Sequence, residues 1–194
     1  MRKSSVERKT GETDIMLALD LDGKGVYEID TGIGFFNHML ELFSKHSLID
    51  LTVKMKGDLE VDCHHSIEDT GIVLGTAIRE ALGDKRAINR YGSFSIPMDE
   101  SLVRVDIDLS GRPYLVFNAR FSKGTVGDMD VETVEEFMMA VCVNAGITMH
   151  VNVIYGSNNH HMVEGIFKAF ARALRKAVET DGRTDGIPST KGIL

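Results

Sequence analysis

The chain has 194 residues and a formal charge of −7 at pH 7, from 22 Lys and Arg against 29 Asp and Glu. This net negative charge argues against a general nucleic-acid binder, because such proteins present a basic surface. Apolar residues make up 43% of the sequence, and there are two cysteines. That composition is typical of a globular, cytoplasmic protein without a disulfide framework. We find no signal-peptide pattern and no apolar run of membrane length, so no membrane partner is expected.

The first half of the chain is predicted to alternate strands with helices. Alternating apolar and polar residues indicate strands within residues 4–27, where 22–25 (DGKG) is expected to form a hairpin turn. Apolar residues at spacings of three and four predict a helix over 34–46, and renewed alternation predicts a strand over 48–55. A second helix is expected over 64–82, because an apolar face recurs there before a glycine and an aspartate.

The second half repeats this order of elements. It is predicted to contain strands at 91–96, 101–109, 114–117 and 147–154 and helices at 131–145 and 160–179. Short motifs recur in register, such as HHSIE at 64–68 and HHMVE at 160–164. We therefore predict an α+β fold with an internal duplication of a βββαβα-type unit, divided into residues 1–85 and 86–194. Helices with one apolar face must bury it, so two roughly four-stranded sheets are expected to sandwich the helices.

Two histidine pairs at the starts of predicted helices are the main chemical signal. Each first histidine lies four residues before a glutamate and faces the same way, while each second histidine points to an adjacent sector. Such a helix can serve two nearby metal ions, one histidine to each, and imidazole with carboxylate suits Mn, Fe, Co, Ni, Cu or Zn. A lone helical histidine is usually solvated, but two matched copies predict a metal site with the ligands His64, His65, Glu68, His160, His161 and Glu164.

Further ligand candidates follow from the duplication. His38 and Glu136 lie on the first helix of each half, at similar distances before the histidine pairs, so a duplicated site would use both. Spacing alone leaves open that Glu136 is a solvated helix residue. His46 is interpreted as a helix C-terminal histidine that interacts favourably with the helix dipole, and His150 as an ordinary strand residue.

A second group of residues has the chemistry to bind an anion. Arginine, lysine and hydroxyl side chains are suited to a phosphate or a carboxylate, and several lie at loop or strand ends or in the C-terminal tail. From sequence alone, ordinary surface charge is an equally good interpretation of each one. The candidates are Arg90, Arg112, Lys168, Ser189, Thr190 and Lys191.

These motifs together resemble the imidazoleglycerol-phosphate dehydratase family of histidine biosynthesis. The resemblance spans essentially the whole chain and suggests a monofunctional protein without a histidinol-phosphatase domain. Its most specific parts are the two histidine motifs and the PSTKG tail. The motifs are FFNHML at 35–40, DCHHSIED at 62–69, RYGSFSIPMDES at 90–101, DLSGRPY at 108–114, HHMVEGIFKAFARAL at 160–174 and IPSTKGIL at 187–194.

The resemblance implies two Mn²⁺ ions per active site. One ion would be held by His38, His65, Glu68 and His161, and the other by His64, Glu136, His160 and Glu164. It also implies a homo-oligomer of 24 subunits with active sites at interfaces. The phosphate would be bound by Arg90, Arg112, Lys168, Ser189 and Lys191, within a second half that ends in a substrate-binding tail. At Leu42 some relatives carry a glutamine near the phosphate, so this position is not expected to contact it.

The implied reaction is dehydration of D-erythro-imidazoleglycerol phosphate to imidazoleacetol phosphate. An imidazolate bound to two metal ions would expel hydroxide and give a diazafulvene, which acidifies the next C–H. We expect Glu164 to take that proton, with Glu12 as the alternative base or as the acid that assists hydroxide loss. Glu12 and Asp99 match active-site acids of the family. A binuclear metallohydrolase and a metal-storage or metal-sensing assembly are the alternative hypotheses.

Overall fold

The two central strands of the first sheet bury every second side chain, so one face of this sheet is directed into the core. In the computed structural model, which describes residues 1–122, 124–183 and 185–194, Ile15, Leu17 and Leu19 of one strand point into the core while their neighbours are partly exposed. The sheet has the strand order β1-β2-β4-β3. Its half of the chain contains β1 (Lys3–Lys9), β2 (Thr13–Asp20), β3 (Tyr27–Asp30), α1 (Gly34–Ser47), β4 (Asp50–Gly57) and α2 (His64–Leu82).

The second half folds in the same way. Its sheet has the order β5-β6-β10-β7, and both sheets join two antiparallel pairs to one parallel pair. This match confirms the α+β fold and the repeated βββαβα order, while the division at residue 85 stays a prediction. The elements are β5 (Tyr91–Met98), β6 (Ser101–Asp108), β7 (Tyr114–Asn118), β8 (Thr125–Val126), β9 (Met129–Asp130), α3 (Thr133–Ala145), β10 (Thr148–Tyr155) and α4 (Asn159–Val178).

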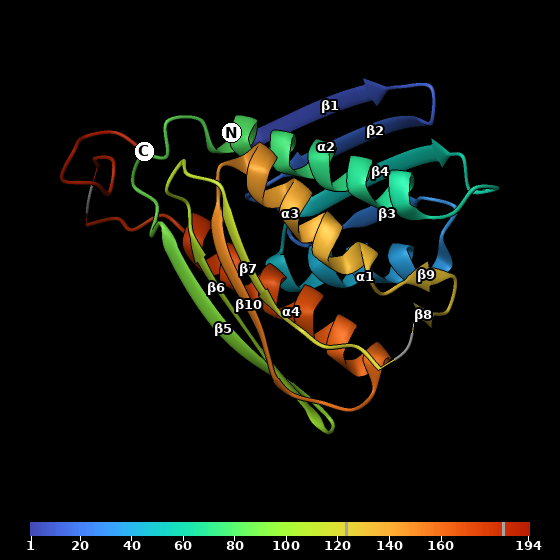
Figure 1. Cartoon of the computed structure of the whole chain (residues 1–194). Coiled ribbons are helices and arrows are strands. Elements are labelled where there is room, and N and C mark those ends of the chain that lie inside the picture. Colours follow the sequence, from blue (N-terminus) through green and yellow to red (C-terminus); the bar gives the residue numbers. More distant parts are fainter. Residues whose placement is uncertain (123, 184) are drawn as a thin grey trace.

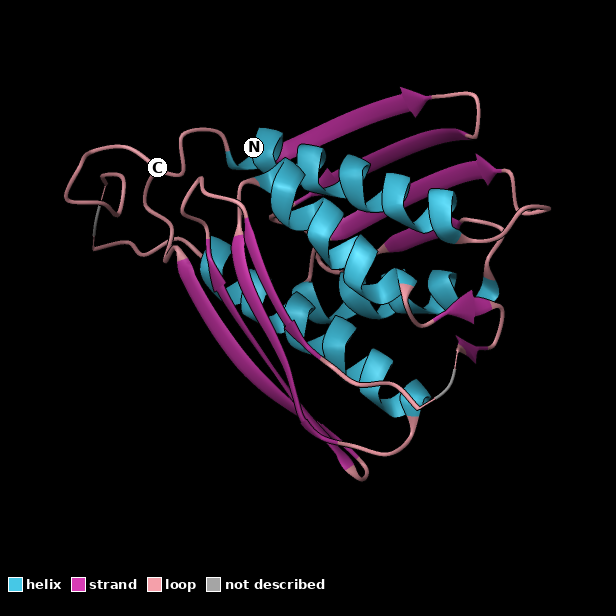
Figure 2. Ribbon diagram, viewed as in Figure 1, coloured by secondary structure: helices cyan, strands magenta, loops and turns pink. Residues whose placement is uncertain are grey.

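Helices α1–α4 form a layer between the two four-stranded sheets (Figures 1 and 2). Each helix pair joins the halves, because α2 packs on α3 and α1 packs on α4. The ring of Phe43 stacks on Phe170 of the other half at a centroid distance of 5.1 Å. An added Cβ at Gly75 of α2 would lie 2.8 Å from the carbonyl oxygen of Val141, so only glycine lets α3 approach this closely. The two halves therefore share one core.

The expected hairpin at residues 22–25 is wrong. Strands β2 and β3 are not neighbours, because β3 pairs in parallel with β4 after the chain has crossed over through α1. The carboxylate of Asp50 accepts hydrogen bonds from the amides of Lys24 and Val26, and these hold the turn against the start of β4. A tight hairpin instead joins β1 to β2.

The β8–β9 hairpin was not predicted, and it lies where the starts of the helices meet. Figure 1 shows the helices beginning at this end of the molecule, with both chain termini at the other. The amide of Gly34 at the start of α1 donates to Asp128, and the amide of Asp130 donates to the Cys63 sulfur just before α2. No helix within the described ranges is long and apolar enough to cross a membrane.

Candidate active site

Side chains from α1 and α4 converge on one carboxylate. His160 Nε2 lies 2.9 Å from Glu164 Oε1, and His38 Nε2 lies 3.4 Å from the same oxygen. Lys168 donates to the other oxygen, Oε2, at 2.5 Å. Burial alone would raise the pKa of Glu164, whose side chain is 9% exposed, but the hydrogen bonds from Lys168 and His160 outweigh burial and lower this pKa. We call His38, His160, His161 and Glu164 the α1–α4 set.

The matching residues on the other helix pair are more open. His64 Nε2 lies 3.7 Å from Glu68 Oε2, and both side chains are close to half exposed. An added Cβ at Gly71 would lie 2.8 Å from the carbonyl oxygen of Phe137, so α3 crosses α2 close to Glu136. We call His64, His65, Glu68 and Glu136 the α2–α3 set.

The second histidine of each pair is held by a carboxylate through its Nδ1 atom. His65 Nδ1 lies 2.9 Å from Asp58 Oδ2, and His161 Nδ1 lies 2.7 Å from Glu100 Oε2. These hydrogen bonds raise the pKa of both histidines. Because a carboxylate occupies Nδ1, Nε2 is the ring nitrogen left to bind a metal ion, which is the usual arrangement of a metal-binding histidine. The donor set of imidazole nitrogens and carboxylate oxygens therefore fits Mn²⁺.

Sequence reasoning missed Asp58 and Glu100. Glu100 carried a usable signal, since it occupies the position in the second half that Glu12 occupies in the first, immediately before the matching strand. Asp58 carried none, because it follows β4 in a loop and reaches His65 only through the folding of α2 onto the sheet.

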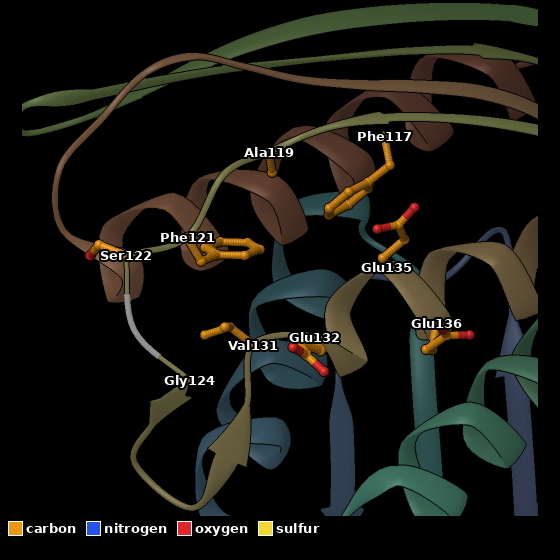
Figure 3. A pocket seen from close by; sticks show the side chains of 9 residues that line it. All are labelled: Phe117, Ala119, Phe121, Ser122, Gly124, Val131, Glu132, Glu135 and Glu136. Carbon is orange, nitrogen blue, oxygen red and sulfur yellow. The ribbon is translucent and has the colours of Figure 1, made fainter.

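Glu136 lines a cavity of about 570 Å³ beside the start of α3 (Figure 3). The opposite wall is formed by the end of β7, with Phe117, and by the segment that follows it, with Phe121. Within residues 1–122, 124–183 and 185–194, the exposed carboxylate of Glu136 makes no hydrogen bond or ion pair. A single chain thus leaves this carboxylate free to meet another group.

A second cavity, of about 260 Å³, gathers most of the anion-binding candidates. Arg90 is fixed there by two hydrogen bonds to Asp108, of 2.7 and 3.1 Å, and by a third, of 2.9 Å, to the carbonyl oxygen of Pro188 in the tail. Lys168 does not line this cavity and pairs with Glu164 instead. The lining residues are Arg90, Ser110, Arg112, Ser189, Thr190, Lys191, Ile193 and Leu194.

The two expected acids lie beside the second histidines. Glu12 Oε2 is 3.9 Å from His65 Nδ1, and Asp99 Oδ2 is 3.7 Å from His161 Nε2. Both carboxylates are exposed, at 56% and 76%. Each can therefore reach a molecule bound next to the histidines.

The remaining histidines lie apart from these sets. His150 is exposed on β10. His46 is in the last turn of α1 as expected, but burial and then the nearby charges of Lys168 and Arg172 lower its pKa. The neutral imidazole is therefore favoured there, and a favourable interaction of His46 with the helix dipole stays a prediction.

The two sets do not form a complete metal site within one chain. Among the described residues, no group of three or more His, Cys, Asp or Glu side chains is arranged to hold a metal ion. Each set offers two histidines with a glutamate, plus one residue from the partner helix. The arrangement thus presents two partial donor sets of similar chemistry.

Comparison with known proteins gives concordant matches. The family model for imidazoleglycerol-phosphate dehydratase matches residues 31–174. Curated proteins of that name from Acetivibrio thermocellus and Caldanaerobacter subterraneus subsp. tengcongensis are 60% and 58% identical to this chain, over 193 and 194 residues. These alignments cover 100% of this chain and 99% and 100% of the relatives.

Two solved structures are also similar. The dehydratase from Staphylococcus aureus is 45% identical with a TM-score of 0.85, over 92% of this chain and 99% of that one. The Pyrococcus furiosus protein, solved in complex with (S)-C348, is 34% identical with a TM-score of 0.84, over 97% of this chain and 100% of that one.

Proposed function

The chain belongs to the imidazoleglycerol-phosphate dehydratase family, a family of hydro-lyases in histidine biosynthesis, and from this premise we propose a metal-dependent dehydration as its reaction. The substrate would be D-erythro-imidazoleglycerol phosphate and the product imidazoleacetol phosphate. One observation carries the proposal. At the start of both α2 and α4, a carboxylate binds Nδ1 of the second histidine and leaves Nε2 available for a metal ion. We place the enzyme in the cytoplasm, where its phosphorylated substrate would be made.

We propose that each active site holds two Mn²⁺ ions. Each ion would draw two ligands from the α1–α4 set and two from the α2–α3 set. One ion would be bound by His38, His65, Glu68 and His161, and the other by His64, Glu136, His160 and Glu164. When bound, the ions would act as Lewis acids on the imidazole ring of the substrate.

An oligomeric enzyme would complete the partial ligand sets that a single chain presents. Within one chain, His38 already lies 3.4 Å from Glu164, although these two residues are assigned to different ions. Glu136 makes no polar contact within the described part of the chain. If the α1–α4 set of one subunit faces the α2–α3 set of another, both partial sets become complete. We therefore propose a homo-oligomer of 24 subunits with active sites at its interfaces.

The chain's own residues divide the chemistry between binding and proton transfer. Arg90, Arg112 and the tail residues Ser189, Thr190 and Lys191 would bind the phosphate in the smaller cavity. Lys168 lies outside that cavity, and it would contact the substrate from its place beside Glu164. Once the hydroxyl group of the substrate had been lost as water, Glu164 would take the C–H proton, since its lowered pKa keeps it ionised. Glu12 is the alternative base, or the acid that protonates the leaving hydroxide, and Asp99 is a second exposed acid.

Complementation tests the function in cells. A histidine auxotroph that lacks this dehydration step is expected to grow without histidine when it expresses the chain. The same chain with His64→Ala and His65→Ala is expected to be expressed but not to rescue growth. Failure of the unmutated chain to rescue, at a verified protein level, would contradict the proposal.

A further inference from the structure

The duplication places one glutamate in equivalent positions of both halves. Glu12 immediately precedes β2 and Glu100 immediately precedes β6, and these two strands have the same length of 8 residues. Each glutamate therefore lies close to the second histidine of its own half. The two carboxylates are nevertheless used differently.

In the second half, Glu100 is fully engaged. Its Oε2 atom accepts from His161 Nδ1 at 2.7 Å. Its Oε1 atom accepts from the amides of Ser157 and Asn158, at 3.3 and 2.9 Å, and from the Ser101 hydroxyl at 2.9 Å. A carboxylate held by four donors has no freedom to reach a substrate.

In the first half, the second histidine is bound by Asp58 and not by the glutamate. Asp58 Oδ2 lies 2.9 Å from His65 Nδ1, whereas Glu12 Oε2 remains 3.9 Å away. The backbone of Glu12 is nonetheless fixed, because its carbonyl oxygen accepts from the Asp58 amide at 3.1 Å and its amide donates to the Thr10 hydroxyl at 3.1 Å. Glu12 therefore presents an exposed carboxylate from a rigid turn.

The equivalent of Asp58 in the second half explains the difference. A register shift between Val153 and Tyr155 in β10 makes Gly156 the match of Gly57. An added Cβ at either glycine would meet the third residue of the histidine helix, Ser66 Oγ at Gly57 and Met162 Cγ at Gly156. The match of Asp58 is therefore Ser157, whose amide donates to Glu100 and whose side chain has no carboxylate to replace Glu100 at the histidine.

We infer that Asp58 and Glu100 are positioning residues that orient His65 and His161 for metal binding, and that Asp58 thereby releases Glu12 to act on the substrate. The inference rests on the proposed function, because it takes both histidines as metal ligands. Without Asp58, Glu12 would take the place at His65 that Glu100 takes at His161. The carboxylates at positions 12 and 58 should then be interchangeable for metal binding but not for turnover.

A double-mutant cycle on Mn²⁺ affinity tests this. The full-length chain is stripped of metal and titrated with Mn²⁺ by calorimetry, as the unmutated protein, Asp58→Gly, Glu12→Gln and the double variant. Each single variant is expected to keep its Mn²⁺ affinity, because one carboxylate remains for His65. The double variant is expected to bind about 10–100-fold more weakly, as is Glu100→Gln, which has no substitute. Asp58→Gly should also lose turnover, since Glu12 is drawn away from the substrate.

Controls separate this inference from the proposed function. Glu60→Gln removes an exposed carboxylate from the same loop as Asp58 and should change neither affinity nor turnover. If Asp58→Gly does not fold, as judged by its Tm, Asp58→Ala replaces it in the cycle. Additive effects of Asp58→Gly and Glu12→Gln on affinity, or full affinity in the double variant, would overturn the inference alone. Absence of Mn²⁺ binding by the unmutated chain would overturn the metal-dependent function and this inference with it.

Discussion

The start of helix α1 is capped by a residue far away in the sequence, and removing that cap should destabilise the protein. The residue before the helix, Ile33, supplies no side-chain hydrogen bond. Instead, Asp128 in the β8–β9 hairpin accepts from the Gly34 amide at 2.6 Å and from the Phe35 amide at 2.9 Å. Loss of a capping side chain costs about 1 kcal/mol, and at an exposed site the helix dipole adds about 0.3 kcal/mol. Asp128→Ala should therefore lower the Tm by about 2–5 °C.

The pH dependence of this effect gives a sharper test. Burial raises the pKa of Asp128, but hydrogen bonds from the Phe35 and Gly34 amides outweigh it and leave the pKa below its ordinary value. Since the folded-state pKa is depressed, the stabilisation is present above about pH 4 and is lost as the pH falls through the folded-state pKa. Thermal unfolding at equal chain concentration should show a Tm gap at pH 7 that closes towards pH 3, with Asp128→Asn intermediate. Equal Tm values at pH 7, or a gap independent of pH, would refute this reasoning.

Three further predictions concern packing, reactivity and substrate binding. Gly75→Ala should destabilise the protein by about 1–2 kcal/mol, because the clash with α3 exceeds the gain in helix propensity. As a control, Gly11→Ala should leave the Tm unchanged, because Gly11 has open space around it. Burial raises the pKa of Cys142 to about 12, so this thiol should resist alkylation at pH 8 until the protein is denatured. Detection of alkylated Cys142 in the native protein by mass spectrometry would contradict this prediction. Arg90→Lys should raise KM about tenfold with a smaller effect on kcat, because lysine cannot reproduce the paired contact to its neighbouring aspartate; unchanged steady-state kinetics would count against a phosphate contact.

Local patterns were sufficient to predict most of the fold. Apolar periodicity predicted helices α1–α4 and the strands of the two four-stranded sheets but not the β8–β9 hairpin, and the repeated motifs indicated the duplicated order that the strand pairing confirms. The prediction of a hairpin at residues 22–25 was wrong because turn residues specify a change of chain direction but not which strand pairs next. A parallel pair such as β3 with β4 requires a crossover, and the tertiary contacts at Asp50 decide where the turn lies.

The candidate site was predictable where its chemistry is local. The histidine–glutamate pairs lie within one helical turn, so their spacing alone brought them together. Glu100 and Asp128 act across 61 and 94 residues of sequence, and Asp58 across seven, through contacts that exist only after α4, α1 and α2 have packed on the sheets. Such contacts leave no local pattern, and their roles come from geometry.

The most direct test of the proposed function is the reaction itself. Purified, metal-stripped chain is incubated with imidazoleglycerol phosphate, with and without Mn²⁺, and the enolised ketone product is followed by its ultraviolet absorbance. The His64→Ala, His65→Ala double variant serves as the control. We expect product only from the unmutated chain loaded with Mn²⁺. No product from that sample, or release of inorganic phosphate in its place, would contradict a dehydratase and favour a metallohydrolase.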